Sequence, residues 1–105
     1  MGGSNMKKDI EKLIDNLKNE KIIRKKKRLF VDLCRILING LVENKFDSFI
    51  VARYIVSAGM FNELVDDPKL NEIIELAGNL ELPIENQIGD NEENWVRLRK
   101  LIGKM

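Results

Sequence analysis

The sequence contains no histidine and only one cysteine, and these shortages exclude several kinds of chemistry. Without histidine the chain has no Ser-His or Cys-His catalytic pair and no imidazole ligand for a metal. One cysteine cannot build a thiolate zinc site. Glycine-rich phosphate-binding motifs of the GxGxxG and GxxxxGK[ST] types are also missing. We therefore expect a protein that is not an enzyme, with no cofactor, no metal and no small-molecule ligand.

Long apolar runs are lacking as well. The longest candidate, residues 29–42, falls short of the ~18 residues that a membrane span needs, and it contains Asp32 and Arg35. Residues 1–5, MGGSN, lack the apolar core of a secretory signal. We interpret them as an added leader before a native start at Met6 and exclude them from the predicted fold. Cys34 lies in the apolar run VDLCRILI, which is typical of a buried thiol in a reducing compartment. We predict a cytoplasmic protein without a membrane partner.

What the chain does have is helical periodicity over most of its length. With 105 residues, of which 44% are apolar and 33% charged, it is long enough for one domain with one modest core. We predict an all-α fold, a compact single-domain bundle of four to five helices, orthogonal or up-and-down. The expected helices cover residues 6–18, 20–43, 48–58, 67–80 and 91–102.

The first two expected helices carry apolar stripes that would face opposite sides of a continuous rod. The first stripe contains Ile10, Leu13, Ile14 and Leu17. The second contains Ile22, Ile23, Phe30, Leu33, Cys34, Leu37 and Leu41. At ~100° per residue the two stripes are centred roughly 170° apart. Either the helix breaks near Asn16 and Asn19, which can end one helix and cap the next, or one long helix reaches a second protomer. We favour the break.

The segment FIVARYIV, residues 49–56, is dense in β-branched residues and would also suit a strand. Signals at both of its ends favour a helix instead. Asp47 can accept the free amides of a first turn, and Gly59 can adopt the left-handed conformation that ends a helix. We therefore predict a helix over residues 48–58 that is apolar nearly all round.

The remaining helices have similar start signals. Asp66 or Asp67 can cap the helix that follows, with Pro68 in its first turn, where the missing N–H is tolerated. Asp90 and Glu93 resemble a capping box for the last helix. Residues 83–91 are expected to form a polar loop. The side chains predicted to be largely buried are Leu33, Leu37, Ile50, Tyr54, Ile55, Ile73, Ile74, Trp95 and Leu98.

Residues 29–43 and 48–58 carry more apolar surface than a bundle of this size easily hides. We therefore expect self-association, most simply as a two-fold homodimer. Charge is also unevenly distributed along the chain. Residues 1–53 hold 13 lysines and arginines against 7 acids, whereas residues 54–105 hold 5 against 10. The first half of the chain therefore has a net positive charge and the second half a net negative charge.

The candidate binding residues lie in this basic half. They follow the i, i+3, i+4, i+7 and i+14 spacing of one helix side: Lys21, Arg24, Lys25, Arg28 and Arg35. Such a basic stripe has three interpretations: a solvated helix face, a surface for an acidic protein partner, or a set of phosphate contacts on nucleic acid. Lys26 falls instead within the apolar stripe and is expected to extend its ammonium group past it to water.

From these features we predict a non-enzymatic helical protein–protein interaction module that associates with itself. The alternative is a nucleic-acid-associated protein or small regulator that uses the basic stripe on phosphates. Against the alternative, the net charge is only +1, whereas nucleic-acid-binding domains are usually strongly basic.

Overall fold

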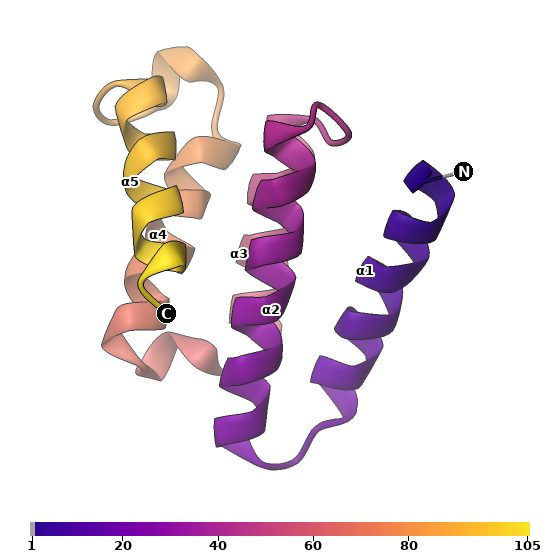
Figure 1. The fold of residues 1–105 in the computed structure, drawn as a ribbon. Coiled ribbons are helices and arrows are strands. Elements are labelled where there is room, and N and C mark those ends of the chain that lie inside the picture. Colours follow the sequence, from indigo (N-terminus) through magenta and orange to yellow (C-terminus); the bar gives the residue numbers. More distant parts are fainter. Residues whose placement is uncertain (1) are drawn as a thin grey trace.

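The computed structural model describes the backbone of residues 2–105 and the side chains of residues 8–105, and within that part the fold is all-helical (Figure 1). The predicted bundle of four to five helices is confirmed. The elements are α1 (Gly2–Asn19), α2 (Ile23–Val42), α3 (Ser48–Phe61), α4 (Pro68–Glu81) and α5 (Asn91–Gly103), with 3₁₀ turns η1 (Leu64–Asp66) and η2 (Ile84–Asn86).

The chain breaks between the first two helices, as favoured from the sequence. Helix α1 ends at Asn19 and α2 begins at Ile23. Asparagine does not cap α2, however, because Ile22 occupies the N-cap position. The Glu20 carboxylate accepts a hydrogen bond from the Ile22 amide at 3.2 Å, which holds the turn. The first helix begins at Gly2, earlier than the predicted start at residue 6.

Helix α3 starts where the sequence predicted and ends later. Asp47 is its N-cap, and the carboxylate accepts a hydrogen bond from the Phe49 amide at 3.3 Å. The predicted end at Gly59 is wrong, because the helix continues to Phe61. Gly59 has a different role: a Cβ atom built on it would overlap the side chain of Ile74 on α4. The glycine therefore allows α3 and α4 to approach closely.

The predicted caps of α4 and α5 are present. Asp67 caps α4 by accepting hydrogen bonds from the amides of Lys69 and Leu70 at 2.9 and 3.2 Å, and Pro68 is in the first turn. Asp90 caps α5 by accepting from the Glu93 amide at 3.0 Å. Both starts were predicted from local sequence, since a cap needs only neighbouring residues.

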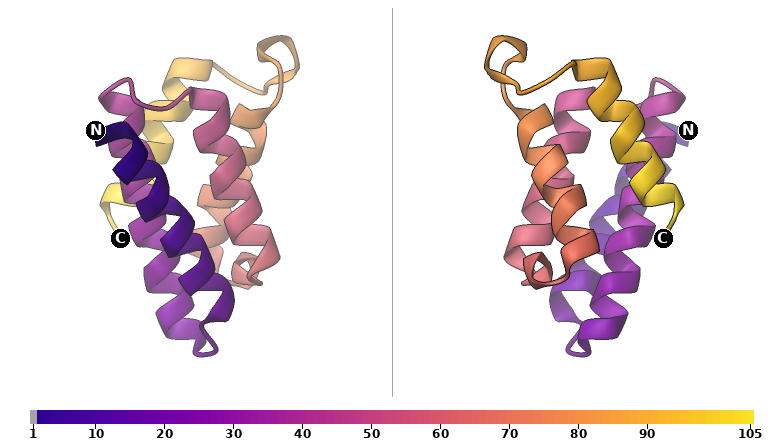
Figure 2. Two further views of the ribbon diagram at one scale, coloured as in Figure 1. Left: turned by 90° about the vertical axis from the view of Figure 1, so that its right-hand side faces the viewer. Right: turned by 90° about the vertical axis from the view of Figure 1, so that its left-hand side faces the viewer.

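Helices α2, α3, α4 and α5 form a closed four-helix arrangement in which each packs against its two neighbours. Helix α1 packs mainly against α2, on the side of the molecule opposite α5 (Figures 1 and 2). The molecule measures 38 × 37 × 22 Å. Its smallest dimension corresponds to about two helix diameters, so one side chain layer between the helices forms the core.

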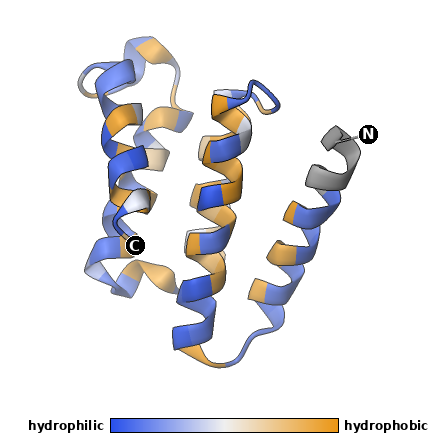
Figure 3. Cartoon of the chain, viewed as in Figure 1, coloured by the Kyte–Doolittle hydropathy of each residue, from blue (hydrophilic) through white to orange (hydrophobic). Residues whose placement is uncertain are grey.

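The core holds most of the residues predicted for it. Six of the nine are buried, namely Leu33, Leu37, Ile55, Ile73, Ile74 and Leu98, while Tyr54 and Trp95 are half-buried. The prediction for Ile50 is wrong, since its side chain is 44% exposed. Ile22 and Ile23 of the second stripe are also exposed; Ile22 is the N-cap of α2 and Ile23 is its first residue. Beyond Ile23 the first turns of α2 are mostly hydrophilic (Figure 3).

Candidate interaction surfaces

All five residues of the predicted basic stripe are exposed, but they do not share one surface. Lys21 lies in the connection before α2, so the helical phase that placed it beside the others does not apply to it. Arg24, Arg28 and Arg35 come together in one depression, and Lys21 lines a different one. Lys25 lines neither of these depressions. The stripe is therefore a cluster of three arginines with two separate lysines.

The depression with the arginines, which we call the arginine cleft, lies between α2 and the start of α4 and has a volume of about 540 Å³. Lys27 and Lys69 also line it, as do the carboxylates of Asp32 and Asp67. Lys27 and Lys69 were not predicted from the sequence, since neither helix alone shows that α4 approaches α2.

Charge in the arginine cleft is partly neutralised. Lys27 forms an ion pair with Asp67 in which Nζ and Oδ2 are 2.9 Å apart. The hydrogen bond from Lys27 holds the pKa of Asp67 below its usual value, and the amides of Leu70 and Lys69 act in the same direction. Burial opposes them. Asp67 thus caps α4 and also pairs with a lysine on the basic face of α2.

Lys21 lines a second depression at the α1–α2 connection, which we call the hairpin pocket. Lys18 and Lys26 line it as well, together with Glu20 and Glu63. Lys26 is half-buried here. Glu63 has a left-handed backbone with φ of 58°, a conformation that few residues other than glycine adopt.

A largely apolar depression lies between α1 and α3, with a volume of about 500 Å³, and was not predicted from the sequence. We call it the α1/α3 groove. Its apolar walls are Ile14 from α1 and a set from α3: Phe49, Ile50, Tyr54, Ala58 and Phe61. Phe61 is 80% exposed, Phe49 46% and Ile50 44%. Three large apolar side chains on one helix are therefore left in solvent.

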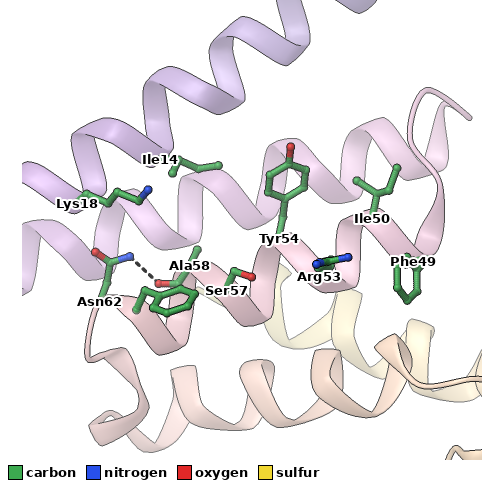
Figure 4. A pocket seen from close by; sticks show the side chains of 10 residues that line it. Ile14, Lys18, Phe49, Ile50, Arg53, Tyr54, Ser57, Ala58 and Asn62 are labelled. Carbon is green, nitrogen blue, oxygen red and sulfur yellow. Dashed lines mark hydrogen bonds between the residues drawn. The ribbon is translucent and has the colours of Figure 1, made fainter.

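Four polar side chains complete the α1/α3 groove (Figure 4). They are Lys18, Arg53, Ser57 and Asn62. Asn62 is buried and donates a hydrogen bond to the carbonyl oxygen of Ala58 at 2.7 Å, which ends α3. Lys18 lies at the Asn62 end, and Arg53 lies in the half that contains Ile50 and Phe49 (Figure 4). Both charged side chains are cations, and no carboxylate is found among the described residues that line the groove.

The sequence held one signal for this groove. Ile50, Tyr54, Ser57 and Phe61 recur at intervals of four, three and four residues, which place them on one face of α3. Of this face, the sequence predicted Ile50 and Tyr54 to be largely buried, because the helix is apolar nearly all round. Only the position of α1 shows that the face stays open, and this is a tertiary feature.

Among side chains 8–105 there is no group of three or more acids and cysteine that could hold a metal ion. Cys34 is buried, and burial raises the pKa of its thiol, so it remains protonated rather than a nucleophilic thiolate. None of the described helices combines the length and the apolar character that crossing a membrane requires.

Comparison with known proteins gives no match: no family model, no curated protein and no solved structure is significantly similar to this chain. Functional inference therefore depends on the geometry of the three depressions.

Proposed function

We propose that this protein is a helical protein–protein interaction module, and that the α1/α3 groove receives the apolar face of a helix from a partner protein. The observation that carries the proposal is the open apolar face of α3. Monomeric proteins rarely leave several large apolar side chains side by side in solvent, and such a patch marks an interaction site.

The spacing of that face favours a helix as the occupant. Intervals of four, three and four residues between Ile50, Tyr54, Ser57 and Phe61 match the seam along which one helix packs on another. Helix α1 flanks this seam but does not cover it, because the groove remains between the two. An amphipathic helix laid between α1 and α3 would complete the packing, in the manner of helix-in-groove recognition.

The charge of the groove favours a partner of a different sequence over a second copy. A two-fold axis through the middle of α3, near Ile55, would bring the Arg53 side chains of both copies toward each other. Lys18 would be added on each side, and the described residues that line the groove include no carboxylate to neutralise them. Self-association therefore stays a prediction from the sequence. The experiment described next treats it as an alternative outcome.

A displayed library of amphipathic helices tests the proposal. Helices of about 18 residues, ~27 Å long, would be selected on the immobilised protein. We expect enrichment of sequences with an apolar stripe. The variant Phe61→Ser should weaken the selected helices by roughly 5- to 30-fold, since burying Phe is worth about 1–2 kcal/mol at this exposure.

The matched control is Ile84→Ser, because Ile84 is 73% exposed but lies outside the groove in η2. It should leave binding unchanged. Circular dichroism would confirm that both variants are folded. The proposal fails if no apolar stripe is enriched, or if Phe61→Ser binds as tightly as the unaltered protein. Light scattering of the protein alone would show whether a second copy fills the groove.

The arginine cleft supports a second candidate, contact with nucleic-acid phosphates. The supporting observation is that Arg24, Arg28 and Arg35 line one depression, and arginine forms bidentate hydrogen bonds with phosphate. Three contacts predict a slope of about −3 for log affinity against log salt on duplex DNA. Titration at several salt concentrations measures it. Weak retention that does not change with salt would exclude this candidate.

A further inference from the structure

The α1/α3 groove has a charge pattern that specifies its occupant more closely. We propose that the partner helix carries carboxylates at both ends of its apolar stripe, one facing Lys18 and one facing Arg53. This inference rests on the function proposed above, because it concerns the same groove.

Both cations are available for a partner. The ion pairs formed within residues 8–105 are Lys27–Asp67, Lys45–Glu43 and Arg97–Glu72, and neither Lys18 nor Arg53 takes part in them. Both side chains are exposed. A basic partner would place like charges together in the groove, whereas an acidic one would pair with both. The groove therefore discriminates by charge as well as by apolar contact.

The positions of the two cations set a spacing on the partner. Lys18 lies at the end of the groove where Asn62 follows α3, and Arg53 precedes Asn62 by nine residues (Figure 4). Nine residues correspond to ~13 Å along α3 between the positions of Arg53 and Asn62. A helix in the groove would span that distance in about nine residues. Allowing for side-chain reach, we expect its carboxylates roughly seven to eleven residues apart, with the apolar anchors between them.

The end with Lys18 should select more strongly for acids. Lys18 and Asn62 line both the α1/α3 groove and the hairpin pocket, so the two depressions meet there. The hairpin pocket adds Lys21 and Lys26. A carboxylate that extends past Lys18 thus enters a region with two further cations, although Glu20 and Glu63 offset part of their field. At the other end, Arg53 is the only cation among the described residues that line the groove there.

The contribution of each carboxylate is modest. Exposed ion pairs change binding by about two- to fivefold each, and added salt screens them. Apolar contacts supply most of the affinity, and the acids determine which amphipathic helices are accepted and in which register. Selection experiments detect preferences of this size because they accumulate over successive rounds.

The test uses a second library in which the apolar positions are fixed as leucine at i, i+4, i+7 and i+11. The flanking positions vary among Glu, Gln and Lys. On the unaltered protein we expect Glu to be enriched at both ends. On Lys18→Glu the preference should change to Lys at one end only, and on Arg53→Glu at the other end only. Lys104→Glu, a cation outside the groove, should leave both preferences as they were.

The outcomes separate this inference from the proposed function. Enrichment of the leucine stripe without a preference for Glu, or with the same preference in Lys18→Glu and Arg53→Glu, would overturn the inference and leave the proposed function intact. If the unaltered protein did not bind the leucine-stripe helices at all, both the inference and the proposed function would be overturned.

Discussion

At the scale of single residues, two positions have structural roles that cannot be predicted from the residue type alone. Gly59 is a helical residue whose missing side chain makes room for Ile74, and Asp67 joins a helix cap to an ion pair with α2. In both cases the deciding neighbour comes from another helix. Substitution at these positions therefore tests tertiary packing rather than local propensity.

Replacing Gly59 by alanine should destabilise the protein. Alanine normally favours a helix over glycine by about 0.5–1 kcal/mol, but at this position its Cβ overlaps Ile74. We expect a net loss of about 1–2 kcal/mol in the free energy of unfolding, measured by urea denaturation. Gly78→Ala on α4 is the matched control, because its nearest neighbour would be Val56 Cγ2 at 4.0 Å. It should be neutral or stabilising. Equal effects of the two substitutions would contradict the close approach of α3 to α4.

Asp67→Asn should remove one source of acid sensitivity. Asparagine caps a helix about as well as aspartate, so the variant loses mainly the pairing with Lys27. Because the folded-state pKa of Asp67 is lowered, its contribution is present above the unfolded value of about 3.9 and is lost as pH falls through the folded value. The variant should be less stable at neutral pH by up to about 1 kcal/mol, and the difference should vanish in acid.

The control for this measurement is Asp90→Asn. Asp90 caps α5 as Asp67 caps α4, but it takes no part in the three ion pairs formed within residues 8–105. Unfolding free energies of all three proteins would be compared from neutral pH down to about pH 2.5, below the unfolded value. A constant difference between Asp67→Asn and the unaltered protein over that range would show that the Lys27 pair does not contribute.

At the scale of the elements, local signals predicted most of the fold. Caps at Asp47, Asp67 and Asp90 placed three helix starts, since a cap and its amides are neighbours in sequence. The sequence could not place the end of α3 or the exposure of Ile50. Both depend on which helices lie beside α3, and an all-apolar helix has no polar face to show which side stays open. The α1/α3 groove was missed for this reason.

Helix α1 should be the least stable helix. It packs mainly against α2, whereas α3 and α4 pack against each other and against further elements. Ile10 and Leu17 are buried and hold it in place, but detaching it leaves the four-helix arrangement of α2 to α5 closed. We expect amides in the middle of α1 to exchange with solvent at least about tenfold faster than those of α4, a difference of ~1.4 kcal/mol. Equal protection would mean that α1 opens only with the whole molecule.

At the scale of the whole molecule, an open apolar groove and an uneven charge distribution give opposite salt dependences for self-association. Pairing of the basic half of one copy with the acidic half of another would weaken as salt screens the attraction. Pairing through the α1/α3 groove would strengthen, because salt screens the repulsion between the Arg53 and Lys18 side chains of two copies while apolar burial persists. The sign of the effect therefore identifies the surface.

We expect the homodimer predicted from the sequence to be weak at low salt and to strengthen as salt rises, because the apolar face of α3 is the larger driving force and like charges oppose it. Sedimentation equilibrium from about 0.05 M to about 1 M salt, where the Debye length falls to ~3 Å, measures the average mass. Phe61→Ser should remove the rise, and Ile84→Ser should keep it. A mass that falls with salt would instead assign self-association to opposite charges, and the groove would then remain free for an acidic helix from another protein.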